Sequence, residues 1–194
     1  GVPLTLLKVN SETQIAVVEM GASHPGDIKE LVDIACPNFG LITNVGKAHL
    51  LGFGSFEGVK KTKGELYDYL RRTSDKVFLN VDNPHLCEMA SERHLQSDPE
   101  RPYSLVIPYG LDYSGAEVLP SSSEHPYLRI KLPAMTVATN LVGSYNADNV
   151  MAAIAVGARF GITTEEAAAA IAAYVPSNNR SQMTSTGRNT LIVD

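Results

Sequence analysis

The apolar positions in the first half of the chain fall into short runs separated by longer amphipathic stretches. The short runs occupy residues 15–19, 40–44 and 76–80. The stretches between and around them carry helix-capping and helix-stopping residues, which predicts helices at residues 3–9, 24–36, 55–71 and 83–93. Strands that alternate with helices indicate an α/β fold, built on a mainly parallel sheet flanked by helices.

The pattern changes after residue 96. Short strand-like runs separated by Pro, Gly and Ser occupy residues 104–108, 116–119, 127–132 and 135–141. They predict a small antiparallel subsheet beside the main sheet. Helices return at residues 146–160 and 163–174, and the second of them begins with a capping box formed by Thr163 and Glu166. Residues 177–185 are polar and resemble a linker, and a last apolar run follows at residues 190–193.

Composition excludes several classes of protein. The chain has 194 residues, of which 44% are hydrophobic, and its formal net charge is -5, which argues against nonspecific binding to nucleic acid. No apolar run is long enough to span a membrane. The two cysteines, Cys36 and Cys87, form no CxxC pair, which favours a reduced, cytoplasmic setting over a disulfide framework.

The helix predicted at residues 55–71 contains a lysine on its apolar face. Its apolar positions are Phe56, Val59, Leu66 and Leu70, and steps of three and four from Val59 to Leu66 pass through Lys63. A partly buried lysine has a lowered pKa and a reactive neutral amine, which can take up CO₂ to give a carbamate. The alternative is that the stem packs while the ammonium reaches water, as we expect for Lys60 and Lys61.

Two further polar residues follow apolar runs. Glu19 ends the run at residues 15–19, and His49 lies in a glycine-rich loop after the run at residues 40–44. Ligands of open parallel sheets bind beyond the carboxyl ends of the strands, where a carboxylate suits a hard cation such as Mg²⁺. Glu19 could equally cap a helix or form an ion pair, and His49 could be a surface residue.

Two asparagines lie one turn apart near the start of the helix at residues 146–160. Asn146 is explained by helix capping alone. Asn149 is less easily explained, because asparagine is a poor helix former and its amide could pair with an adenine edge. No G-x-x-x-x-G-K-[ST] motif occurs in the chain, so it contains no P-loop.

Several motifs taken together resemble the Mur ligases, ATP-dependent amide ligases of peptidoglycan synthesis. The motifs are EMGASHPGDI at residues 19–28, ITNVGKAHLLGFGS at 42–55, KGEL at 63–66 and GSYNADNVMAA at 143–153. Their order is specific, although no single motif is. Within the family they are most similar to ligases that add D-alanyl-D-alanine to UDP-N-acetylmuramoyl-tripeptide through an acyl phosphate.

The resemblance implies a role for each candidate residue. Residues matching Glu19 and His49 hold Mg²⁺ in the family, and the lysine matching Lys63 is carbamylated and serves a second metal ion. The asparagine matching Asn149 contacts the adenine of ATP, with Asn146 beside it. Residues matching Arg180 and Asp194 reach the phosphates and ribose of the nucleotide.

The resemblance also implies a division of the chain. Residues 1–176 correspond to the central, ATP-binding domain of the P-loop NTPase-like fold without its P-loop segment, and residues 177–194 to a linker and first strand toward a C-terminal domain. We therefore expect a fragment that is inactive alone. The alternatives are another ligase of this superfamily, such as a folylpolyglutamate synthase, or a non-catalytic binding domain of the same fold.

Overall fold

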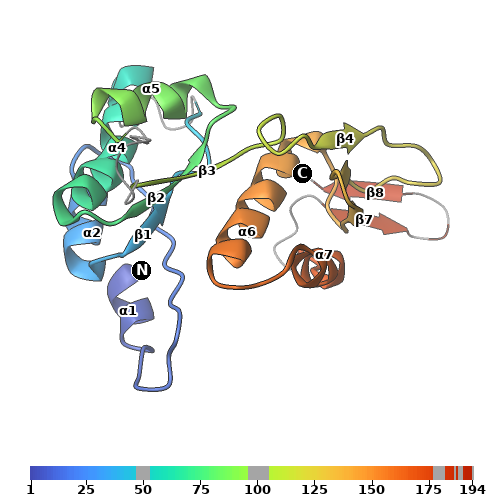
Figure 1. The fold of residues 1–194 in the computed structure, drawn as a ribbon, viewed down its shortest axis with the longest axis horizontal. Helices are drawn as coiled ribbons and strands as arrows, with labels where there is room; N and C mark the ends of the chain where they lie inside the picture. Colours follow the sequence, from blue (N-terminus) through green and yellow to red (C-terminus); the bar gives the residue numbers. More distant parts are fainter. Residues whose placement is uncertain (47–52, 96–104, 177–181, 186, 188–189, 194) are drawn as a thin grey trace. The chain divides into compact units, whose positions relative to one another are not determined.

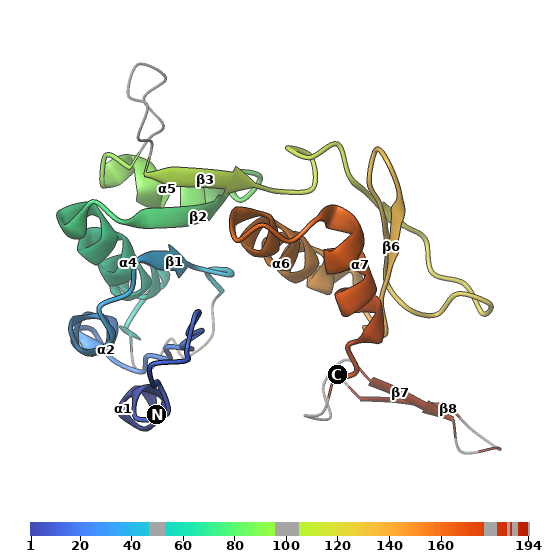
Figure 2. The same cartoon turned by 60° about the horizontal axis from the view of Figure 1, so that its bottom comes forward.

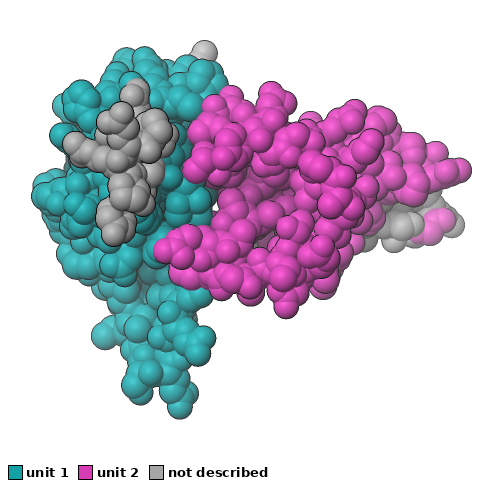
Figure 3. Space-filling view, viewed as in Figure 1, with its two compact units in different colours: residues 1–79, 83–107 teal, residues 80–82, 108–194 magenta. Residues whose placement is uncertain are grey.

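The structure of the chain is a computed structural model that describes residues 1–46, 53–95, 105–176, 182–185, 187 and 190–193. The chain forms two compact units, coloured separately in Figure 3. Unit 1 contains residues 1–79 and 83–107, and unit 2 contains residues 80–82 and 108–194. His49, Arg180 and Asp194, three of the candidate residues, lie outside the described part of the chain.

The main sheet has three strands in the order β1-β2-β3, with bounds Phe39–Leu41, Lys76–Asn80 and Val106–Tyr109. Strands β1 and β2 are parallel, with Phe39 opposite Lys76 and Leu41 opposite Phe78. Val77 donates its backbone N–H to Leu105 at 2.7 Å, and Val81 donates to Tyr109 at 2.9 Å. This constant offset makes β2 and β3 parallel as well.

Among the described residues, the helices of unit 1 that accompany this sheet are α1 (Val2–Leu6), α2 (Asp27–Ala35), α4 (Phe56–Thr73) and α5 (Pro84–Glu92). Figures 1 and 2 both show α4 between α5 and α2. The core of the unit is formed by side chains that are completely buried, among them Val32, Leu70, Val77 and Leu86. Asn83 begins α5 by accepting hydrogen bonds from the backbone of His85 and Leu86, as the sequence predicts.

Unit 2 contains a three-stranded antiparallel sheet, formed by β4 (Glu117–Leu119), β5 (Arg129–Lys131) and β6 (Thr136–Ala138). A short 3₁₀ turn, η1 (Ser144–Asn146), leads into α6 (Ala147–Arg159), which is followed by α7 (Thr164–Ala173). The predicted capping box is confirmed. Glu166 accepts from the N–H of Thr163 at 2.8 Å, and the Thr163 hydroxyl accepts from the N–H of Glu166 at 3.2 Å.

The predicted fold class is confirmed: a parallel sheet flanked by helices accompanies a small antiparallel sheet. The predicted strand at residues 15–19 is wrong. These residues form no strand, and Ile15 and Val17 are 54% and 86% exposed. The physical reason is pairing, because an apolar run becomes a strand only where a neighbouring strand satisfies its N–H and C=O groups, and no described strand pairs with this one.

Two strands differ from the sequence prediction. Strand β3 joins the parallel sheet beside β2 and not the antiparallel sheet. Residues 182–185, expected to be part of a loop, form β7 (Gln182–Ser185), which pairs antiparallel with β8 (Thr190–Val193). In both cases the partner strand decides the outcome, and the local sequence does not identify it.

Two of the expectations drawn from composition concern features that the structure describes. Within the described residues, no helix is both long and apolar enough to cross a membrane. Cys36 and Cys87 are both free thiols, one exposed and the other partly buried.

Candidate functional site

Helix α4 carries the central candidate residue, and its sequence explains where it starts and stops. The Ser55 hydroxyl accepts a hydrogen bond from the N–H of Gly58 at 3.0 Å, so Ser55 is the N-cap that the sequence predicts. Glu57 lies in the first turn, and Arg71 and Arg72 lie in the last turn, where each charge interacts favourably with the helix dipole. Ser74 ends the helix in the left-handed conformation, with φ of 60°.

Lys63 extends from α4 toward the chain that leaves β1. Its Nζ donates to the backbone carbonyl of Asn44 at 2.8 Å, and Asn44 lies shortly after Leu41, the last residue of β1. The side chain is half-buried, and this burial lowers the pKa of Lys63 from 10.5. A neutral carbonyl is its hydrogen-bond partner, and no carboxylate among the described residues pairs with the ammonium form. The amine is therefore close to the carboxyl end of a parallel strand and easier to deprotonate than an ordinary lysine.

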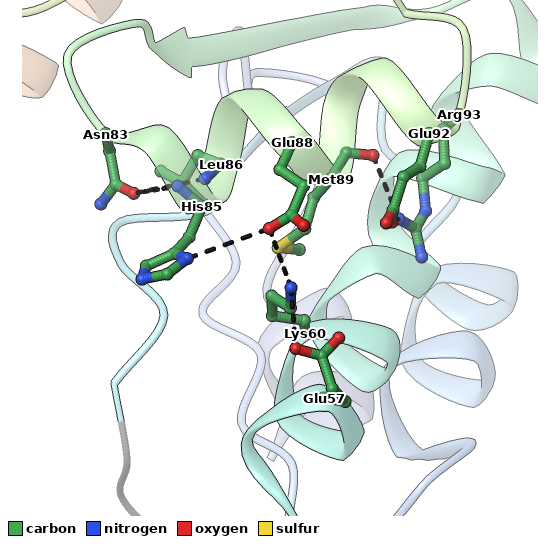
Figure 4. Close-up of polar contacts among 9 residues, drawn as sticks. All are labelled: Glu57, Lys60, Asn83, His85, Leu86, Glu88, Met89, Glu92 and Arg93. Carbon is green, nitrogen blue, oxygen red and sulfur yellow. Dashed lines mark hydrogen bonds and ion pairs between the residues drawn. The ribbon is translucent and has the colours of Figure 1, made fainter.

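The neighbouring lysines occupy different surroundings. Lys61 is exposed, as expected. Only 7% of the surface of Lys60 is exposed, so the expectation that Lys60 lies on the solvent-exposed face of the helix is wrong. Its Nζ is 2.8 Å from Glu88 of α5 and 2.9 Å from Glu57 of α4 (Figure 4). The hydrogen bond that Lys60 donates to Glu88, and then the one it donates to Glu57, raise the pKa of Lys60 from 10.5. Carboxylate partners thus make burial of this charge tolerable, which a helical pattern alone cannot indicate.

An aromatic contact completes the surroundings of Lys60. The Phe56 ring lies with its centroid 5.8 Å from the Lys60 Nζ, and it meets the imidazole of His85 edge to face at 4.9 Å. The same imidazole is 4.0 Å from Glu88, as Figure 4 shows. Lys60 is therefore a structural cation that links α4 to α5, whereas Lys63 pairs with no carboxylate among the residues that the structure describes.

Glu19 lies in an extended segment, and its side chain is exposed. No hydrogen bond or ion pair joins it to any part of the chain that the structure describes, so neither the capping nor the ion-pair alternative is supported. Among the described residues there is no group of three His, Cys, Asp or Glu side chains that could hold a metal ion. No hydrogen bond or ion pair joins Glu19 to Lys63 in the described part of the chain, and the role of Glu19 stays a prediction.

The two asparagines lie at the start of α6. Asn146 is buried and occupies the N-cap position, yet its side chain does not cap the helix. Its Nδ2 donates backward to the carbonyl of Val142 at 2.9 Å, so capping does not explain this residue. Asn149 is exposed, and its Nδ2 donates to Oδ1 of Asn146 at 3.4 Å. The buried amide thus orients the exposed one. Tyr145, whose ring is 55% exposed, directly precedes them.

One residue that sequence analysis missed ties two helices of unit 1 together. Glu65 of α4 accepts hydrogen bonds from the backbone N–H groups of Gly26 and Lys29, both at 2.9 Å. These groups belong to the first turn of α2, whose N-cap is Gly26 in the left-handed conformation, with φ of 94°. Because glycine has no side chain, it cannot cap its own helix. A glycine at a predicted helix start was therefore the signal that the cap comes from elsewhere.

A family comparison now defines the class of protein. Residues 1–157 match the Mur ligase middle domain family. The chain therefore belongs to the Mur ligase family, as the sequence motifs indicate.

The relatives in this family are ligases of one kind. The UDP-N-acetylmuramoyl-tripeptide–D-alanyl-D-alanine ligase of Mycobacterium leprae is 33% identical over 207 residues, covering 100% of this chain and 39% of that protein. The ligase of the same name from Bacillus subtilis is 31% identical over 194 residues, covering 100% of this chain and 40% of that protein. The chain thus spans about two fifths of the length of these relatives.

Solved structures show the same fold. MurF from Acinetobacter baumannii superposes with a TM-score of 0.79 at 24% identity, over 100% of this chain and 41% of that protein. MurF ligase from Thermotoga maritima, solved in complex with ADP, gives a TM-score of 0.73 at 22% identity, over 100% of this chain and 43% of that protein.

Proposed function

We propose that this chain is the central domain of an ATP-dependent amide ligase that adds D-alanyl-D-alanine to UDP-N-acetylmuramoyl-tripeptide in peptidoglycan synthesis. The relatives at 31% and 33% identity carry that name. The observation that carries the proposal is Lys63, a half-buried amine near the carboxyl end of β1 that donates its hydrogen bond to a carbonyl. Residues 1–176 form this domain in the proposal, and residues 177–194 lead out of it.

Lys63 acts in the proposal as a carbamate. The neutral amine attacks CO₂, the N–C bond forms and a proton leaves, which gives an anionic side chain with two oxygen atoms. Burial favours the first step, since it lowers the pKa of Lys63. The carbamate then needs a cation to persist in this half-buried position.

The donor set fits a magnesium ion in its chemistry. Mg²⁺ takes oxygen ligands, and Glu19 offers an exposed carboxylate that pairs with no other residue in the described part of the chain. Glu19 and His49 would hold Mg²⁺ in this proposal, and carbamylated Lys63 would serve a second metal ion. When bound, Mg²⁺ neutralises charge on the phosphoryl group that is transferred.

The start of α6 is the proposed adenine subsite. The exposed amide of Asn149 can both donate to and accept from a base edge, and Asn146 fixes its direction. Arg180 and Asp194 would contact the phosphates and ribose. ADP is bound in the solved structure of the Thermotoga maritima relative, which supports nucleotide binding by this domain.

The proposed reaction has two steps. The tripeptide carboxylate attacks the γ-phosphorus of ATP, ADP leaves, and an acyl phosphate forms. The amine of D-alanyl-D-alanine then attacks the acyl carbon, phosphate leaves, and the nitrogen loses a proton to give the amide.

The test uses the protein expressed from its complete coding sequence, with ATP, Mg²⁺ and both substrates. We expect phosphate release that requires every component, together with a product whose mass equals the two substrates joined with loss of water. This chain alone should give neither, because its 194 residues contain no P-loop to hold the β- and γ-phosphates. Absence of product from the complete protein would refute the proposal, and turnover with a folate and glutamate instead would favour the alternative ligase.

A further inference from the structure

Lys63 lies on a helix that is tied to its neighbours on two sides. Lys60, one turn before Lys63, joins α4 to α5 through Glu88 at 2.8 Å. Glu65, two residues after Lys63, joins α4 to the first turn of α2 through two hydrogen bonds of 2.9 Å. Both views of the fold place α4 between these two helices (Figures 1 and 2).

The two ties act on different sides of the helix. Each residue of an α-helix advances by about 100°, so Lys60 and Glu65 lie about 140° apart around α4. Ion pairs of Arg72 with Asp33 and of Asp68 with Arg93 hold the C-terminal half of α4. Lys60 and Glu65 act in the turns that carry Lys63, and ties on different sides of these turns restrict their rotation. The rotation of α4 decides where the Lys63 side chain points, because that side chain departs from the same two turns.

We propose that Lys60 and Glu65 are positioning residues that hold the Lys63 amine beside the carbonyl of Asn44. Neither has to contact a substrate. Glu65 is well suited to this task because α2 has a glycine N-cap and needs a cap from another element. The importance of this placement for turnover rests on the proposed function, but the placement itself does not.

The variants keep the size of each side chain. Glu65→Gln retains one acceptor oxygen and loses the second, together with the charge that favours a helix N-terminus. Lys60→Met keeps the buried stem and removes the ammonium, and it leaves its two carboxylate partners at positions that are 74% and 50% exposed, where water can solvate them. Glu30→Gln removes the same charge from the same end of α2, and the Glu30 side chain pairs with no other residue in the described part of the chain. Lys61→Met removes an exposed lysine of α4.

Two measurements test the placement in the complete protein without requiring activity. Hydrogen–deuterium exchange in the peptide spanning residues 24–30 should become about fivefold faster in Glu65→Gln, the equivalent of one lost net hydrogen bond, and should be unchanged in Lys61→Met.

Hydroxyl-radical footprinting follows side-chain exposure, not charge. In Glu65→Gln, oxidation of Lys63 relative to Lys61 should rise. In Lys60→Met it should also rise, measured relative to another exposed lysine. In Glu30→Gln it should not rise.

Ligase kinetics supply the third measurement. A displaced catalytic group costs up to about a hundredfold, so kcat should fall between about tenfold and a hundredfold in both positioning variants, with KM values unchanged. Unchanged oxidation of Lys63 in both variants, with the fold intact by circular dichroism, would overturn the inference. Increased oxidation of Lys63 in both variants, in a protein whose wild type shows no ligase activity, would instead leave the placement standing and remove the proposed function.

Discussion

Replacement of Lys63 by alanine in the complete protein separates a catalytic role from a structural one. In the structure, the variant loses a hydrogen bond of 2.8 Å between Nζ and the Asn44 carbonyl. This bond is made by a half-exposed side chain, so solvent screens it, and its net contribution to the free energy of unfolding is about 1 kcal/mol. In a domain of about 150–250 residues this loss lowers the melting temperature by about 2–4 °C, and in the larger complete protein we expect a smaller decrease.

The expected loss of activity is far larger. Removal of one preorganised electrostatic group from a catalytic site costs about 10²–10³ in kcat. A loss of about 1 kcal/mol from a total stability of about 5–15 kcal/mol leaves almost all molecules folded, so unfolding cannot produce such a decrease. Phosphate release and differential scanning fluorimetry on the same samples therefore distinguish the two effects.

Short carboxylic acids provide a chemical test of the carbamate. An acid that enters the space left by Lys63→Ala can supply oxygen ligands, and we expect it to restore part of the lost turnover. The matched control is Lys61→Ala, an exposed lysine of the same helix. Lys60→Ala is unsuitable as a control, because Lys60 is buried between two carboxylates. If Lys63→Ala has the turnover of Lys61→Ala, the catalytic assignment fails.

Three further variants test the packing that supports the site. Leu70→Ala should cost about 2–5 kcal/mol of unfolding free energy, because Leu70 is completely buried, and chemical denaturation measures it. The melting temperature of the wild type should decline as the pH falls below 4.5, and Glu88→Gln should make this decline shallower. Lys60 lowers the pKa of Glu88 from 4.5, so the ion pair stabilises the fold above that pH and is lost as the pH falls through the pKa that Glu88 has in the folded protein. Gly143→Ala should weaken ADP binding, measured by calorimetry, because φ of 91° disfavours a side chain by about 1–2 kcal/mol and the new methyl would meet the Tyr145 ring.

Each variant has a control and an outcome that contradicts it. Leu4→Ala removes a leucine that is 66% exposed and should change stability little; equal losses for both leucines would contradict the packing argument. A pH profile of Glu88→Gln identical to that of the wild type would mean that the ion pair adds nothing. Gly46→Ala places a methyl in open space at a glycine with no positive φ, and it should leave ADP affinity unchanged.

Elements with local signals were predictable from the sequence. Strand β2 has the predicted bounds Lys76–Asn80, and the capping box at Thr163 is present. Both depend on residues close together in the chain, where propensity and capping are informative. The position of Lys63 on an otherwise apolar helix face could be predicted for the same reason, because it follows from the spacing of apolar residues within one helix.

Features set by distant partners could not be predicted. Residues 15–19 have the composition of a strand, but no neighbouring strand pairs with them. Lys60 is buried because Glu88, 28 positions away, neutralises it. The cap of α2 comes from Glu65, 39 positions from Gly26. In each case the deciding contact crosses a long stretch of chain, and periodicity along a single element contains no information about it.

The cap that Glu65 provides has a consequence for the order of folding. Helix α2 has only nine residues, and a helix this short is marginal in water before it packs. Its first turn is completed only after a loop of 39 residues closes, whereas α4 has its own cap in Ser55 and 18 residues. Helix α4 should therefore acquire structure first and serve as the template on which α2 forms. In a φ-value analysis, mutations in α4 would slow folding, while loss of the Glu65 carboxylate would chiefly accelerate unfolding.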